Sequence, residues 1–339
     1  MNAARGRFQD ADNSRRATDG AGAGTVANLP EPLKFRILGP LEVSDAGRPI
    51  RLGGAKQRSV LAILLLRAGE AVSIDSLVDG LWGESPPDDA ASALQQHVSR
   101  LRRALEPHEV LRTRSPGYVA ELAGCELDLH EFERRCDEGR RSLEAGRPAD
   151  AAETLRGALN LWRGRPLADL EHQPFARDAI ARLDELWLDA VESRVEADLA
   201  LGRHGELVAE LGTLVRRHPL RERLRAQLML ALYRSGRQAD ALEVYAEGRR
   251  LLVDELGLEP GPELKRLQRA ILDHDPALEH ERPRPALIRT AGGRGWAAGA
   301  AGLLAAVVAV LLMAGDGEDE KRRPSADGGE LVAVDAATG

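Results

Sequence analysis

A short motif that recurs in the second half of the chain limits the possible fold more than any other feature. Residues 146–151 read GRPADA and residues 236–241 read GRQADA, and residues 202–207 read GRHGEL as a looser third copy. Each copy interrupts an apolar pattern of helical spacing, and a glycine just past the last helical residue is a common way to end a helix. The motif therefore predicts helices joined by short turns between residues 127 and 276.

The distance between two copies indicates how these helices are arranged. Gly202 and Gly236 lie 34 residues apart, which is the period of a tetratricopeptide repeat. Arrays of such helix pairs bury a continuous core and leave a groove for partners, so the stretch predicts binding rather than catalysis. An ordinary helical bundle is the alternative interpretation.

The composition supports a mainly α chain and argues against several functions. Hydrophobic residues make up 43% of the chain but aromatic residues only 3%, so aliphatic side chains must fill the core and an all-β fold is excluded for most of the length. The net charge of -7 argues against a protein that coats nucleic acid by bulk charge. Cys125 and Cys136 are eleven residues apart and form neither a zinc motif nor a disulfide framework. No catalytic constellation, phosphate-binding loop or cofactor motif is visible, so we expect neither an enzyme nor a cofactor.

Residues 33–122 predict a small module in which strands surround three helices. Alternating apolar residues favour short strands at 33–39, 41–43 and 49–52. Helices are expected at 55–68, at 74–81 after a capping Ser73, and at 89–105. Residues 111–122 read as two strands around a turn at 115–117, which predicts a β-hairpin. The expected fold is a winged helix-turn-helix with a small sheet, three helices and a hairpin wing.

The third predicted helix has one apolar and one polar side. At 100° per residue its leucines and valine fall on one stripe, and the polar side chains fall on the opposite side. Arginine and glutamine can make paired hydrogen bonds to purine edges, and serine and arginine suit phosphate oxygens. A merely solvated face is the alternative interpretation for a lone helix. The apolar stripe contains Leu94, Val98, Leu101 and Leu105, and the polar side contains Ser92, Gln96, Ser99, Arg100 and Arg103.

With this arrangement of elements, the module resembles the OmpR-type winged helix of response regulators. The resemblance is carried by VSRLRR at 98–103, Arg114 and the Gly117-Tyr118 pair. It resembles the Streptomyces antibiotic regulatory protein type more closely, and residues 127–276 resemble the bacterial transcriptional activation domain of that same family. The matching blocks are LGPLEV at 38–43, GAKQR at 54–58, LWG at 81–83, LWRG at 161–164, PLAD at 166–169, EADL at 196–199, HPLRER at 218–223 and ELGLEPGP at 255–262.

The resemblance implies double-stranded DNA as the ligand. It places the third helix in the major groove, the wing in the adjacent minor groove and the loop at 83–88 toward RNA polymerase. The family motif carries Arg100 and Arg103 onto the recognition helix and Arg114 onto the wing. No receiver domain precedes the winged helix, so phosphorelay control is not implied. The full set of candidate DNA-binding residues is Lys56, Arg58, Ser92, Gln96, Ser99, Arg100, Arg102, Arg103 and Arg114.

The charge of this module bears on how it would bind DNA. Residues 33–122 contain twelve Lys or Arg and eleven Asp or Glu, a net charge of +1. Because the module is not strongly basic, its affinity must depend on where charge is placed and on two copies binding together. The charge of the module therefore predicts a homodimer that binds direct repeats.

The remaining segments predict a membrane attachment. Residues 1–32 are polar and glycine-rich, as in a disordered leader. Residues 277–295, rich in Arg, Pro and Gly, resemble a linker, and residues 296–314 form an uncharged apolar run long enough to cross a bilayer as a helix. These features predict a single-pass protein of the cell membrane with cytoplasmic N-terminal domains and an extracytoplasmic tail at 315–339.

The patterns together predict a sequence-specific DNA-binding transcriptional regulator. We expect an activator that recruits RNA polymerase and is anchored in the membrane through residues 296–314. The alternative is a membrane-anchored helical-repeat scaffold whose winged helix mediates protein contacts rather than DNA contacts.

Overall fold

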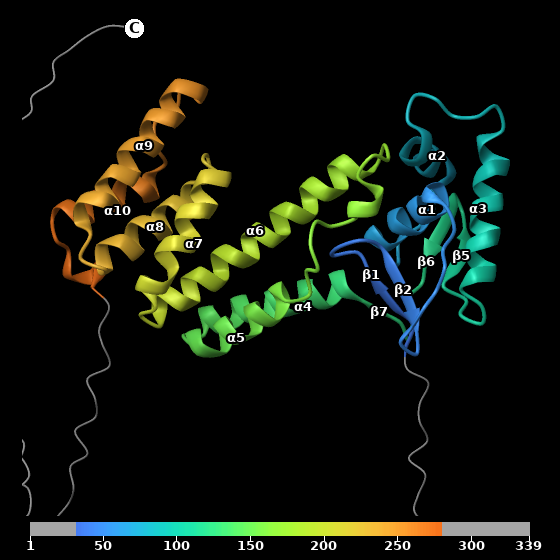
Figure 1. Cartoon of the computed structure of the whole chain (residues 1–339), viewed down its shortest axis with the longest axis horizontal. Coiled ribbons are helices and arrows are strands. Elements are labelled where there is room, and N and C mark those ends of the chain that lie inside the picture. The colour runs from blue at the N-terminus through green and yellow to red at the C-terminus, as the bar shows by residue number, and fades with distance from the viewer. Residues whose placement is uncertain (1–31, 280–339) are drawn as a thin grey trace, which may run out of the picture. The chain divides into compact units, whose positions relative to one another are not determined.

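The structure, a computed structural model, describes residues 32–279. The predicted leader before residue 32, the linker beyond residue 279, the apolar segment at 296–314 and the tail at 315–339 lie outside the described residues. Within them the chain is mainly helical with small sheets near the N-terminal end, which confirms the predicted fold class (Figure 1).

The N-terminal module contains every element that the sequence predicted there. Three short strands precede a group of three helices, and a two-stranded hairpin follows the third helix. The Oγ of Ser73 accepts a hydrogen bond from the Ser76 N–H at 3.1 Å, so the predicted cap of the second helix is confirmed. The elements are β1 (Lys34–Arg36), β2 (Glu42–Asp45), β3 (Arg48–Pro49), α1 (Ala55–Leu66), α2 (Ile74–Trp82), α3 (Ala90–Ala104), β5 (Leu111–Arg114) and β6 (Gly117–Ala120).

Two further strands of two residues each were missed in the sequence. β4 (Val72–Ser73) pairs antiparallel with β6, which gives a sheet of order β4-β6-β5 and fastens the hairpin to the start of α2. β7 (Glu126–Leu127) pairs parallel with β1 and completes a sheet of order β3-β2-β1-β7. Two residues are too few to show an alternating pattern, so only the folded chain reveals these strands.

The hairpin approaches β4 closely because residue 117 is a glycine. Gly117 lies opposite Ser73 in the strand pairing, and a Cβ on Gly117 would lie 2.0 Å from the carbonyl oxygen of Val72. The N–H of Ile74 also donates to the carbonyl of Pro116 at the hairpin turn. The absence of a side chain therefore lets the wing pack against the N-terminal end of α2.

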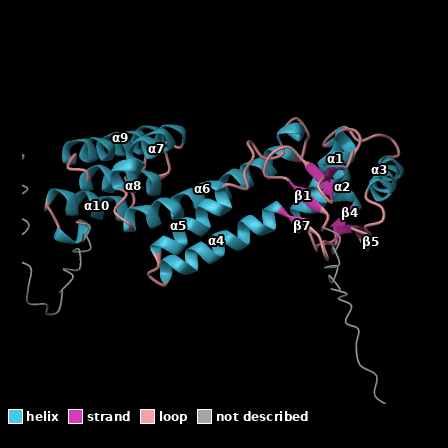
Figure 2. Ribbon diagram, turned by 60° about the horizontal axis from the view of Figure 1, so that its bottom comes forward, coloured by secondary structure: helices cyan, strands magenta, loops and turns pink. Residues whose placement is uncertain are grey.

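The second module is built from packed helical pairs. α4 packs on α5, α5 on α6, α7 on α8 and α8 on α9, as the two views in Figures 1 and 2 show. The helices are α4 (Asp128–Glu144), α5 (Pro148–Leu159), α6 (Ala176–Ala200), α7 (His204–Arg217), α8 (Glu222–Arg234), α9 (Gln238–Leu256) and α10 (Pro262–Leu272), with single 3-10 turns η1 (Ala168–Leu170) and η2 (Pro276–Leu278).

The recurring glycine motif ends a helix in all three places, as predicted. Gly146, Gly202 and Gly236 have φ values of 69°, 76° and 77°, a left-handed conformation that glycine adopts without a steric penalty. In each copy the arginine after the glycine donates its N–H to a carbonyl five residues earlier, which closes the last turn in a Schellman arrangement. These bonds run from Arg147 to Ser142, from Arg203 to Asp198 and from Arg237 to Leu232.

α6 is the helix that connects the two hydrophobic cores. Ile180 and Leu183 near its N-terminal end belong to a core that also contains the winged helix, α4 and α5. Leu188, Val191 and Val195 belong to a second core formed with α7, α8, α9 and α10. α6 is 25 residues long, and this one continuous helix therefore reaches from the winged-helix module to the last helical pairs.

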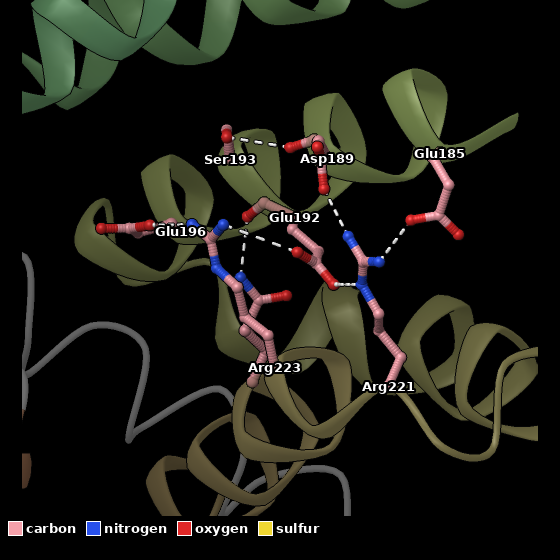
Figure 3. Close-up of polar contacts among 8 residues, drawn as sticks. Glu185, Asp189, Glu192, Ser193, Glu196, Arg221 and Arg223 are labelled. Carbon is pink, nitrogen blue, oxygen red and sulfur yellow. Dashed lines mark hydrogen bonds and ion pairs between the residues drawn. The ribbon is translucent and has the colours of Figure 1, made fainter. Parts of the chain in front are cut away.

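Ion pairs between carboxylates of α6 and arginines at the start of α8 hold the two helices together (Figure 3). Arg221, just before α8, contacts three carboxylates on successive turns of α6: Glu185 at 2.5 Å, Asp189, and Glu192 at 2.9 Å. The carboxylate of Glu192 is almost fully buried, with 2% of its side chain exposed, and it also lies near Arg223. A buried carboxylate without a partner is costly, so this paired arrangement depends on the position of α8.

Hydrogen bonds across the boundary join the two predicted modules. The Asp169 carboxylate in η1 accepts from the Leu41 N–H at 2.7 Å and from the Arg58 Nε at 2.8 Å, and the Arg58 Nη2 also donates to the Leu41 carbonyl at 2.6 Å. At the start of α4, the carboxylate of Asp128 accepts from the N–H groups of Ile37 and Leu38 at 2.9 and 3.0 Å. The segment between β1 and β2 thus has its backbone groups satisfied by the second module.

We predict that Asp169→Ala lowers the free energy of unfolding by about 1–3 kcal/mol, because the N–H of the buried Leu41 and the guanidinium of Arg58 lose a charged acceptor. The check is urea unfolding of the full chain followed by circular dichroism. Asp150→Ala is the control, since the Asp150 carboxylate forms only an exposed ion pair with Arg147, and it should change stability by about 0.5 kcal/mol or less. Equal losses for both variants would contradict the role given to Asp169.

Candidate nucleic-acid interface

α3 has the two faces that its sequence predicted. Leu94, Val98 and Leu101 are buried with at most 1% of each residue exposed, so one side of the helix packs on the module core. The opposite side is open to solvent in the described part of the chain. Its exposed residues are Ser92, Gln95, Gln96, Ser99, Arg100 and Arg103.

The start of α3 is fixed by Asp89. The Oδ1 of Asp89 accepts from the Ser92 N–H at 3.0 Å, which satisfies a backbone donor that the first helical turn would otherwise leave free. Hydrogen bonding from the side chain and backbone of Ser92 lowers the pKa of Asp89. Because the folded pKa lies below the unfolded value, the contribution of the cap to stability is present at neutral pH and is lost as the pH falls through the folded pKa.

Three arginines of the predicted site have no partner within residues 32–279. Arg100 and Arg103 lie on the exposed face of α3, and Arg114 ends β5 directly before the hairpin turn. Within the described chain, none of the three guanidinium groups makes a hydrogen bond or an ion pair. Their donors are therefore available to an external acceptor such as a phosphate or a base edge.

Arg102 differs from these three in its surroundings. Its Nε donates to the carbonyl of Leu111 at 2.9 Å, and its Nη2 donates to the Oγ1 of Thr113 at 2.8 Å. Its guanidinium carbon lies 5.8 Å from the centre of the Tyr118 ring, which is within the range of a cation–π contact. Arg102 thus lies between α3 and the wing, and Figure 1 shows these elements side by side.

Lys56 and Arg58, which we also predicted to contact DNA, lie at the junction with the second module. The Nζ of Lys56 donates to the carbonyl of Leu81 and to the Oε1 of Gln173, and burial lowers the pKa of Lys56. Arg58 bonds to Asp169 and Leu41 as described above. Both side chains therefore have intramolecular partners, and the sequence did not reveal these because Gln173 and Asp169 lie more than a hundred residues further along the chain.

His97 is a residue near the interface that sequence reasoning missed. Its ring centre lies 6.3 Å from that of Trp82 on α2, so the side chain packs between the two helices. Burial, and then the positive charges of Arg100 and Lys56, lower the pKa of His97. A lowered pKa favours the neutral imidazole at neutral pH, which suits a position beside an aromatic ring.

The loop between α2 and α3 is exposed over its whole middle part. Residues 84–89 are all exposed, and they include the acidic side chains of Glu84 and Asp88. The loop begins at Gly83, whose φ of 58° turns the chain away from α2. This exposed acidic loop is the segment for which the family resemblance implied RNA polymerase contact.

The described residues offer no metal site of three or more His, Cys, Asp or Glu side chains. Cys136 is buried, and burial raises the pKa of its thiol to about 11. A thiol with that pKa stays protonated at neutral pH, so it is a poor metal ligand and a poor nucleophile.

Comparison with known proteins places the chain among transcriptional regulators. Residues 47–120 match the family described as "Transcriptional regulatory protein, C terminal", and residues 127–272 match the "Bacterial transcriptional activator domain". The regulatory protein DnrI of Streptomyces peucetius is 39% identical over 261 residues, which cover 74% of this chain and 96% of DnrI. The chain belongs to the Streptomyces antibiotic regulatory protein family. Family membership confirms the prediction that it is not an enzyme.

Other members of the family differ in length from this chain. The regulatory protein AfsR of Streptomyces coelicolor is 47% identical over 247 residues, but the match covers 73% of this chain and only 25% of AfsR. A solved structure of Mycobacterium tuberculosis EmbR, in complex with a low affinity phosphopeptide, superposes with a TM-score of 0.68 at 37% identity and covers 72% of this chain and 66% of that one. The family models match the winged helix and the helical module that follows it in this chain.

The predicted membrane localisation is wrong on these findings. The relatives are regulatory proteins by name, and no helix within residues 32–279 is long and apolar enough to span a membrane. Even α6, with 25 residues, carries ionisable side chains on every turn. The prediction of a single-pass protein with cytoplasmic N-terminal domains rested on residues 296–314, which lie outside the described part of the chain.

We predict that Asp89→Ala exposes the first turn of α3 to exchange. Without the carboxylate the Ser92 N–H has no acceptor, so amide hydrogen exchange should be faster there than in the unchanged chain. Asp89→Ser should keep protection close to the original, because a serine oxygen can also cap a helix. Asp88→Ala is the matched control, and a similar gain in exchange for Asp88→Ala and Asp89→Ala would argue against the cap.

Proposed function

We propose that this protein is a sequence-specific DNA-binding transcriptional activator, with α3 in the major groove and the β5–β6 wing in the adjacent minor groove. The observation that carries the proposal is the pairing of a buried apolar face of α3 with an exposed face whose arginines have no partner in residues 32–279. An α-helix fits the width of the major groove, where arginine can bond to guanine through two donors at once.

The candidate residues divide by position. Arg100 and Gln96 lie on the exposed face of α3 and would read base edges, while Ser92, Ser99 and Arg103 would bind phosphates beside them. Arg114 at the end of β5 would enter the minor groove with the wing. Lys56 and Arg58 keep their intramolecular partners in this proposal, and their charge adds to the positive field rather than making direct contacts.

Two copies of the protein on direct repeats fit the charge of the module. One copy offers few unpaired basic side chains, and each neutralised phosphate contributes only a part of the affinity. Binding of a second copy to an adjacent half-site would supply the remainder, as in other winged and helix-turn-helix regulators that bind repeated sites.

Recruitment of RNA polymerase completes the proposed activation step. The α2–α3 loop is exposed and acidic, and it adjoins the recognition helix, so it would remain accessible when α3 occupies the groove. Such a loop suits a basic surface on a partner protein.

We predict that Arg100→Ala weakens binding to a cognate site by about 1–3 kcal/mol and relaxes preference at one base pair, because a base contact is lost. Arg103→Ala should weaken binding to all sequences alike and lower the slope of log affinity against log salt by about 1. The measurement is fluorescence anisotropy of the full chain with duplexes selected by this protein from a random pool, at several salt concentrations.

Arg250→Ala provides the control for charge, because Arg250 is exposed on α9 in the second module. It should leave both affinity and salt slope unchanged. If Arg100→Ala and Arg103→Ala also left binding unchanged, α3 would not be the reading element. If no duplex were selected at all while the winged helix captured a protein, the scaffold interpretation would replace this proposal.

We also predict that the double change Glu84→Ala and Asp88→Ala separates binding from activation. The variant should bind the selected duplex with unchanged affinity, since neither side chain lies on α3, and should lose most stimulation of transcription in a reaction reconstituted with RNA polymerase. Glu153→Ala, an exposed acidic change on α5, is the control and should activate normally. Full activation by the loop variant would show that polymerase contact lies elsewhere.

A further inference from the structure

The wing is a short hairpin, so something must fix its position relative to α3. On one side β6 pairs with β4 through Val72↔Tyr118 and Ser73↔Gly117, which joins the wing to the start of α2. On the other side, β5 is linked to the last turn of α3 by the side chain of Arg102. The wing is therefore held between the two helices of the helix-turn-helix.

The contacts of Arg102 are specific for its guanidinium group. Nε donates to the Leu111 carbonyl, and Nη2 donates to the Thr113 hydroxyl, two residues further along the same strand. Thr113 and Tyr118 are paired across the hairpin, so the hydroxyl and the ring that faces the guanidinium belong to one cross-strand pair. A planar fork of donors can reach both acceptors while lying over the ring, whereas a lysine ammonium cannot.

Arg102 differs from the neighbouring arginines of α3 in its exposure and in its hydrogen-bond partners. Arg100 and Arg103 are exposed on α3 without an intramolecular partner in the described chain, but Arg102 is half-buried and uses donors from two of its nitrogens inside the module. To bind a phosphate with those donors, Arg102 would have to give up contacts that hold the wing.

We propose that Arg102 is a positioning residue that sets the placement of the wing relative to the recognition helix. It lets Arg114 on the wing and Arg100 on α3 engage the same DNA site at the same time. The proposal rests on the DNA-binding function proposed above, and it replaces the direct contact that the sequence predicted for Arg102.

The first test needs no DNA. In the full chain, Arg102→Met keeps the length and apolar stem of the side chain but removes its donors, and it should raise amide hydrogen exchange across β5 and β6. Arg103→Met should leave exchange in the wing unchanged. Thr113→Val removes only the hydroxyl and should give a smaller increase, while Thr113→Ser should restore protection. Unchanged wing exchange in Arg102→Met would overturn the proposal.

The second test is a double-mutant cycle with Arg114 on a selected duplex. Arg102→Met should weaken binding about tenfold in the original background, the equivalent of ~1.4 kcal/mol, because the wing no longer presents Arg114. In an Arg114→Ala background the same change should cost about twofold or less, since the contact it supports is already lost. Additive effects would show that Arg102 acts independently of Arg114, either by binding DNA directly or through a general loss of stability, and would overturn the proposal.

One control and the exchange experiment separate the possible failures. Arg103→Met combined with Arg114→Ala should be additive, because both side chains are proposed to contact DNA independently. Partial unfolding of Arg102→Met would weaken binding equally with and without Arg114, so the cycle also excludes a general loss of stability. If the unchanged chain selected no duplex, the proposed function would fail, while the exchange experiment would still decide whether Arg102 holds the wing.

Discussion

The carboxylate of Asp169 makes the interaction on which the arrangement of this chain most depends. It accepts hydrogen bonds from the Leu41 N–H and from the Arg58 guanidinium, and Arg58 also donates to the Leu41 carbonyl. These hydrogen bonds join η1, α1 and the segment after β1. Backbone donors and acceptors removed from water must be paired, and here the second module supplies the partners. The DNA-binding module and the first helical pair consequently share one hydrophobic core.

α6 extends from the core that the winged helix shares with the first helical pair to the core of the last helices. Its N-terminal part packs in the first of these cores and its C-terminal part in the second. There, Arg221 and Arg223 form ion pairs with Glu192 and Glu196 of α6 and so hold α6 against α8. A partner that binds the distal helices would act on the winged helix through a helix that is fixed at both ends. Movement of α6 away from α8 would disturb the buried Glu192 pair, which is costly to break because the carboxylate would be left buried without its partner.

Local patterns predicted the elements well, whereas the roles of individual basic residues depended on distant contacts. Helical periodicity alone identified the buried and exposed faces of α3, and the glycine motif identified three helix ends. Two-residue strands escaped detection because they carry no period. Lys56, Arg58 and Arg102 are basic residues like Arg100, and the sequence does not separate them from it. Their intramolecular partners include groups in η1, the η1–α6 connection and the wing, so only the folded chain distinguishes them.

The nearly neutral charge of residues 33–122 is compatible with DNA binding because the acidic residues are unevenly placed. Residues 90–105 contain three arginines and no Asp or Glu, so the surface formed by α3 is locally positive. Several basic side chains elsewhere in the module form ion pairs, among them Lys34 with Glu126 and Arg36 with Glu42. Potential near a surface depends on the nearest charges within about 10 Å at ordinary salt, so this local excess governs attraction to phosphates while the net charge of the whole chain does not.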